Sequence, residues 1–149
     1  MRKKFNKILA LGIVIAICLS CSAFAIDIPV SPNASSYLAS YGAYCYANGN
    51  GNFTVYFDVT GNGYQNYLGV SSVVIRQSSN GGSTWSTVYS FNYPSVSRLM
   101  GTNCMYYDNY VTYYGTAGYE YYAILYFWGG SSLSIGDSRT YVTTTIIAT

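Results

Sequence analysis

Polar and apolar residues alternate in several segments of the chain beyond residue 36. The clearest case is the segment 52–60, whose apolar residues occupy every second position: Phe53, Val55, Phe57 and Val59. A period of two residues puts these side chains on one face of a β-strand and leaves the other face in water. We therefore expect a half-buried antiparallel strand here, ended by Gly61-Asn62-Gly63.

Six further segments are rich in the Val, Ile, Thr and Tyr residues that favour strands. The predicted strands cover residues 37–46, 68–77, 84–92, 105–114, 119–128 and 140–148, with a connection over 94–101. Gly-rich and Asn-rich stretches separate most of them and favour turns. About seven short strands joined by turns predict an all-β domain. An antiparallel β-sandwich is the architecture we favour, and a closed barrel is the alternative.

The first 25 residues have the features of a secretory signal peptide. Basic residues at the start precede an apolar stretch over residues 8–19, and Ala23-Phe24-Ala25 matches a cleavage site. The apolar stretch is too short for a stable membrane span. We therefore expect a secreted protein, extracellular or associated with the cell wall, with no membrane insertion after cleavage. An extended arm over 26–36 would then lead into a sandwich domain over 37–149.

Cleavage would reverse the sign of the net charge. The full chain has a formal charge of +2, but all of its lysines lie in the first 25 residues. The remaining 124 residues keep three arginines against five carboxylates, which gives −2. Nucleic-acid binding needs a clustered basic surface, so we do not expect nucleic acid as a partner.

Cleavage would also leave a chain with neither His nor Lys. This composition excludes Ser-His-Asp, Cys-His and Ser-Lys catalytic arrangements, and it removes a common ligand of zinc. We therefore expect no metal, no cofactor and no enzymatic activity. A hydrolase that uses two carboxylates remains a remote alternative, and the candidates for such a pair are Asp58, Asp108, Glu120 and Asp137.

Two cysteines remain after cleavage, Cys45 and Cys104. Two cysteines in an exported domain of this size most simply form one disulfide. We therefore expect a bond between them. Closing a loop of roughly 60 residues would stabilise the fold by about 4 kcal/mol.

Tyrosine occurs 19 times in the chain, more often than one small core needs. The segment 119–128 is aromatic on both faces, and its alternation leaves open which face is buried. Exposed Tyr and Trp side chains are rigid and amphipathic, and they form recognition surfaces for sugars and proteins. We expect four of the aromatic residues to bind a partner: Tyr56, Tyr122, Tyr126 and Trp128.

These features favour a non-catalytic binding module that recognises a glycan or a protein at the cell surface. The alternative is a structural protein that associates with copies of itself, because a sheet without lysines lacks the usual protection of its edges.

Residues 78–85, Ser-Ser-Asn-Gly-Gly-Ser-Thr-Trp, resemble the Asp-box pattern Ser-x-Asp-x-Gly-x-Thr-Trp, with Asn80 in place of Asp. In sialidases and other β proteins this box is a hairpin turn. The resemblance implies that Ser78, Asn80 and Thr84 hold the turn around Gly82 while Trp85 packs beneath it. Asn accepts the same amide bonds as Asp. Sialidases are multi-bladed propellers and this chain is too short to form one, so the box implies a turn and no activity.

Residues 118–123 and the strand that follows the next glycine-rich loop resemble the final hairpin of a fibronectin type III or immunoglobulin-like domain. In such domains a tyrosine near the start of the penultimate strand forms a tyrosine corner, a role that the resemblance gives to Tyr119 or Tyr121. The cysteine positions differ from those of immunoglobulin domains, so a fibronectin-like sandwich with its own disulfide is the better description. The whole chain also resembles small, secreted, tyrosine-rich proteins of unknown function from Gram-positive bacteria, and that resemblance implies no activity.

Overall fold

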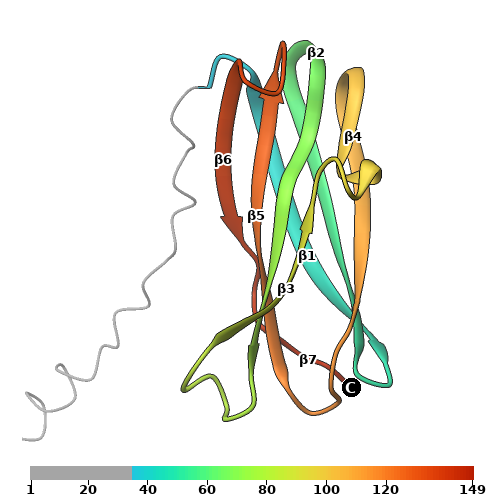
Figure 1. Ribbon diagram of the computed structural model, residues 1–149, viewed down its shortest axis with the longest axis vertical. Coiled ribbons are helices and arrows are strands. Elements are labelled where there is room, and N and C mark those ends of the chain that lie inside the picture. Colours follow the sequence, from blue (N-terminus) through green and yellow to red (C-terminus); the bar gives the residue numbers. More distant parts are fainter. Residues whose placement is uncertain (1–34) are drawn as a thin grey trace, which may run out of the picture. The chain divides into compact units, whose positions relative to one another are not determined.

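The computed structural model describes residues 35–149 (Figure 1), which form an all-β structure as predicted. The predicted signal peptide and all but the last two residues of the predicted arm lie outside this range. Its seven strands are β1 (Leu38–Gly49), β2 (Asn52–Ser78), β3 (Ser86–Asn92), β4 (Met100–Tyr114), β5 (Glu120–Gly130), β6 (Gly136–Val142) and β7 (Ile146–Ile147). A short 3₁₀-helix, η1 (Ser97–Leu99), precedes β4. No helix in residues 35–149 has the length and apolar character needed to cross a membrane.

Strand β2 lies at the centre of a single antiparallel sheet of seven strands. It is hydrogen-bonded to β1, β3, β4 and β5, whereas β6 and β7 pair with β5. Residues 52–60 of β2, which we call its first arm, lie between β1 and β4. Residues 65–78, its second arm, pair with the start of β4, with β5 and with β3. One strand thus joins both halves of the sheet.

A bend separates the two arms of β2, at the point where its pairing with β4 is interrupted between Thr60 and Gln65. A Cβ atom at Gly61 would lie only 2.8 Å from the carbonyl oxygen of Gly63, so the bend needs glycine at that position. Strand β4 bends nearby, where Asn103 adopts a left-handed φ of 52°. In Figure 1 both strands rise to one end of the domain and turn back, and the sheet curls into a half-barrel. The prediction that Gly61-Asn62-Gly63 ends a strand is therefore wrong.

The core lies on the concave side of the curled sheet. The four apolar residues of the first arm are at most 2% exposed, as their alternation predicts. A register shift between Val70 and Ser72 lets Val70 and Val73 both face the core. Strand β5 turns one of its two aromatic faces inward, through the buried residues Tyr121, Ala123, Leu125 and Phe127.

The predicted disulfide between Cys45 and Cys104 is wrong, because both cysteines are free. Cys45 on β1 lies opposite Val55 of β2, which in turn lies opposite Val111 of β4. The two cysteines are therefore on opposite sides of β2. Cys104 is also seven residues along β4 from Val111, a span of up to about 23 Å at about 3.3 Å per residue. A disulfide needs Cα atoms within about 7 Å of each other.

Several strand boundaries in the structure also differ from the predicted ones. The predicted strands over 52–60 and 68–77 are one strand, β2, and the predicted strand over 140–148 divides into β6 and β7. Strand β4 begins at Met100, inside the stretch predicted to be a connection. The total of seven is unchanged because the merger and the division offset each other.

Phe127 of β5 contacts aromatic rings from three other strands. Its ring centroid lies 5.0 Å from that of Tyr41, 6.5 Å from that of Phe57 and 6.4 Å from that of Tyr141. We expect Phe127→Ala to lower the free energy of unfolding by about 3–5 kcal/mol, because it leaves a cavity that these rings line. Urea denaturation measures the change. Tyr64→Ala is the control: Tyr64 is 82% exposed, and its removal should change stability by no more than about 0.5 kcal/mol. Equal urea concentrations at the unfolding midpoints of the two variants would contradict the assignment of Phe127 to the core.

The residues that precede β1 are held to β6 by one carboxylate. The Ser35 hydroxyl and the Ser36 backbone N–H donate to Oδ2 of Asp137 at 2.5 and 2.9 Å. The bond from Ser35 is the main reason why the pKa of Asp137 is lowered; partial burial opposes the shift, while backbone bonds and Arg139 add to it. The ionised carboxylate therefore stabilises the folded protein.

This interaction predicts a pH-dependent effect of Asp137→Asn. A carboxyl group whose pKa is lowered by folding stabilises the protein fully above its unfolded-state pKa, and the contribution is lost as the pH falls through the folded-state pKa. We therefore expect the variant to melt below the parent at pH 7, and the gap to close as the pH is lowered beneath 3.8, the ordinary value for aspartate. Thermal melts across this range measure the gap. A gap of constant size would mean that the ionised form is not what Ser35 and Ser36 stabilise.

Candidate functional site

The outer face of β1, β2 and β4 carries a row of three tyrosines. Tyr44 of β1 lies opposite Tyr56 of β2, which lies opposite Tyr110 of β4. Because Val55 and Phe57 face the core, the alternation of the strand turns Tyr56 outward. The ring centroids of Tyr44 and Tyr56 are 5.1 Å apart, with planes inclined by 16°, and those of Tyr56 and Tyr110 are 5.6 Å apart. We call these three residues the tyrosine row.

Two aspartates occupy the next outward position along the same strands. Asp58 of β2 and Asp108 of β4 lie directly opposite each other, and both are exposed. Neither carboxylate has a hydrogen-bond or ion-pair partner within residues 35–149. Like charges at directly opposed positions of a sheet repel each other. The aspartate pair is therefore a negative charge that the described part of the chain leaves uncompensated.

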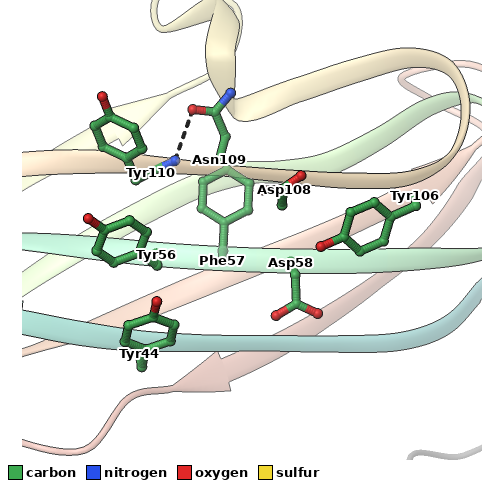
Figure 2. Close-up of a pocket in the computed structure, with 8 residues that line it drawn as sticks. All are labelled: Tyr44, Tyr56, Phe57, Asp58, Tyr106, Asp108, Asn109 and Tyr110. Atoms are coloured by element: carbon green, nitrogen blue, oxygen red, sulfur yellow. Dashed lines mark hydrogen bonds between the residues drawn. The ribbon is translucent and has the colours of Figure 1, made fainter.

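The tyrosine row and the aspartate pair line one open pocket with a volume of about 240 Å³. Figure 2 shows the three tyrosines following one another across the strands, with the aspartates and Tyr106 to one side. The pKa of the Tyr106 hydroxyl is raised, first by loss of solvent and then by the charges of Asp108 and Asp58. The potential at this end of the pocket is thus negative.

One arginine borders the tyrosine row. The guanidinium carbon of Arg98, in η1, lies 5.6 Å from the ring centroid of Tyr110. The Tyr107 hydroxyl donates to the Arg98 carbonyl oxygen at 2.9 Å and so ties η1 to β4. A cation at this distance from a tyrosine ring is attracted by the negative face of the ring. The row therefore already holds one cation, supplied by the protein itself.

The structure separates the four aromatic residues predicted to bind a partner. Tyr56 belongs to the tyrosine row. Tyr126 is 37% exposed on β5, and Tyr122 packs edge-on against Trp85 with ring centroids 4.6 Å apart. Trp128 donates from Nε1 to the Ser132 carbonyl oxygen at 3.3 Å.

Trp128 also lines a second pocket, with a volume of about 320 Å³ and mostly apolar walls: Ser71, Tyr93, Pro94, Met100, Leu133 and Ser138 complete its lining. No charged side chain is among these residues. Of the four predicted binding residues, only Tyr56 therefore lies beside charged groups and further rings in a pocket.

Residues 78–85 form a turn held by the side chains that the Asp-box resemblance names. The Ser78 hydroxyl oxygen accepts the backbone N–H groups of Asn80 and Gly82 at 3.3 and 3.0 Å. Oδ1 of Asn80 accepts the N–H of Thr84 at 3.0 Å, and Nδ2 of Asn80 donates to the Thr84 hydroxyl at 2.9 Å. These polar side chains are bonded within the turn, and Trp85 packs on Tyr122 beside it.

Burial disfavours the ionised form of both thiols. Burial raises the pKa of Cys45, an effect that the hydrogen bond between its Sγ and Oγ1 of Thr143, at 3.3 Å, partly offsets. Burial also raises the pKa of Cys104. A raised pKa reduces the thiolate fraction at neutral pH, and the thiolate is the reactive form. Within residues 35–149, no three His, Cys, Asp or Glu side chains gather closely enough to hold a metal ion.

Sequence reasoning missed most of the residues around Tyr56. The predicted strands over 37–46 and 105–114 have outward positions at Tyr44, Tyr106 and Tyr110. The alternation within each strand therefore indicates that these three tyrosines are exposed. The sequence offers Asp58 and Asp108 only as two of four carboxylates that could form a pair. Their juxtaposition depends on the register between β2 and β4, which the alternation within a single strand does not specify.

Comparisons of the chain with models of protein families, with curated proteins and with solved structures find no match.

Proposed function

We propose that this protein is a non-catalytic binding module that recognises a glycan outside the cell through the tyrosine row. The observation that carries the proposal is the alignment of three tyrosines across three strands in one pocket, with Tyr44 57% and Tyr110 45% exposed. Aromatic rings pack against the C–H faces of sugars, and tyrosine hydroxyls remain free to form hydrogen bonds. Carboxylate oxygens beside the rings accept hydrogen bonds from sugar hydroxyls.

The location outside the cell follows from the proposed signal peptide in the first 25 residues. An exposed row of rings is also suited to an extended ligand. A sugar chain that lies across the strands meets Tyr44, Tyr56 and Tyr110 in turn, since neighbouring strands are about 4.8 Å apart.

We further propose that the curled sheet is a fibronectin type III-like sandwich. Its pairing supports this, because β1, the first arm of β2 and residues 106–114 of β4 form one set of strands. The second arm, β3, β5 and β6 form another set, which the start of β4 joins. Tyr121 adds support: it is fully buried, and its hydroxyl accepts the backbone N–H of Thr116 at 2.8 Å. A hydroxyl bonded to the backbone a few residues upstream is the feature of a tyrosine corner. In this arrangement the tyrosine row lies on the outer face of the three-stranded set.

Self-association is a second candidate function, favoured by the free edge of β4. Within residues 35–149 this 15-residue strand pairs only with β2, and its one charged residue is Asp108. A long edge with little charge is a template for strand pairing with another chain. Sedimentation velocity over a hundredfold range of concentration distinguishes the two functions: a glycan-binding module stays monomeric, whereas an assembly protein gains mass.

The proposed glycan site predicts the effect of the double variant Tyr44→Ala/Tyr110→Ala. We expect its affinity for the recognised polysaccharide to fall about tenfold or more, since an aromatic contact is worth about 0.5–1.5 kcal/mol beyond its buried area. The melting temperature should change little, because both rings are largely exposed. Co-sedimentation with insoluble cellulose, chitin, chitosan and xylan measures the affinity.

Tyr64→Ala and Tyr126→Ala are the matched controls, because both remove an exposed tyrosine outside the tyrosine row. Both should bind as the parent does. Full binding by the double variant, or loss of binding in Tyr126→Ala, would contradict the assignment of the site to the tyrosine row.

A further inference from the structure

The uncompensated charge beside the tyrosine row points to the class of glycan, an inference that rests on the proposed function. Asp58 and Asp108 face each other across β2 and β4 without a cationic partner in residues 35–149. A cation placed between them relieves their mutual repulsion and forms charge-assisted hydrogen bonds with both carboxylates. Arg98 does not do this: its guanidinium lies over the ring of Tyr110 and forms no ion pair with either aspartate.

The aromatic part of the pocket also favours a cation. Arg98 on Tyr110 is a cation–π contact, and Tyr44 and Tyr56 extend the same row away from Arg98. An ammonium group within about 6 Å of a tyrosine ring centroid gains the same kind of attraction. The pocket therefore combines rings that take the C–H face of a sugar with carboxylates that take a positive charge.

We propose that this pocket binds an oligosaccharide of 2-amino sugars whose amines are free. Such a sugar carries both required features on one ring: an apolar C–H face for a tyrosine and an ammonium group for the aspartate pair. An N-acetylated or neutral sugar offers the face without the charge. A linear polyamine offers the charge without the face, and an anionic sugar is repelled by the aspartates.

Isothermal titration calorimetry tests this with a hexamer of β-1,4-linked glucosamine and its fully N-acetylated counterpart. The parent protein should bind the amine hexamer at least tenfold more tightly than the acetylated one. The difference should shrink as salt is raised, because exposed charges are screened. Spermidine, as a polyamine without sugar rings, should bind at least tenfold more weakly than the amine hexamer.

The variant Asp58→Asn/Asp108→Asn keeps the size of both side chains and removes both charges. We expect the ratio of the two hexamer affinities to fall to about one. The variant should melt no lower than the parent, because the repulsion between the opposed carboxylates is gone, and a melt therefore confirms that it is folded. Glu120→Gln is the control: it removes one carboxylate on β5, outside the pocket, and it should keep the parent's ratio.

The inference is overturned if the parent binds both hexamers equally, or if the double variant retains the preference for the amine. Equal binding of spermidine and the amine hexamer overturns it as well, since the tyrosine row would then add nothing. Preference for an anionic hexamer such as oligogalacturonate would assign the selection to Arg98 instead. If neither glucosamine hexamer binds, the inference fails, and co-sedimentation of the Tyr44→Ala/Tyr110→Ala variant with the polysaccharide panel decides the proposed function separately.

Discussion

The hydrogen bonding of β2 to four other strands is the constraint on which the rest of the structure depends. Its first arm sets the positions of β1 and β4, and its second arm sets those of β3 and β5. The bend between Thr60 and Gln65 joins these two sets and lets both arms of one continuous strand contribute to the core. With both cysteines free, the fold is held by this pairing and by the burial of the alternating apolar residues.

The same pairing creates the candidate site. Side chains on a strand alternate between faces, so a slip of one residue would turn Tyr56 into the core and bring Phe57 to the surface. The observed register instead aligns three outward tyrosines, and the next outward position brings Asp58 and Asp108 together. The exposed rings and the repelling carboxylates contribute little to the core. We propose that a ligand, rather than packing, accounts for their concentration in one pocket.

Local patterns predicted the local parts of this structure. The alternation over 52–60 identified the buried face of the first arm, and the side chains of residues 78–85 indicated a turn, because both features depend on neighbours in the sequence. The site depends on register between strands that are distant in sequence, so Tyr56 was selected without Tyr44 and Tyr110. The disulfide was inferred from compartment and cysteine count, which carry no information about the place of Cys45 and Cys104 on either side of β2. Glycines that commonly end a strand instead bend β2, because its pairing with β4 resumes beyond them.

We infer that the register of β1, β2 and β4 makes the tyrosine row a ligand-binding surface. To test this, an oligosaccharide that binds the protein is added in steps while NMR follows the chemical shifts of the backbone amides. We expect the largest changes in chemical shift around Tyr44, Tyr56 and Tyr110, and we expect them to extend to Asp58 and Asp108. Changes centred on Trp128 and Leu133 in the second pocket, with the tyrosine row unaffected, would contradict it.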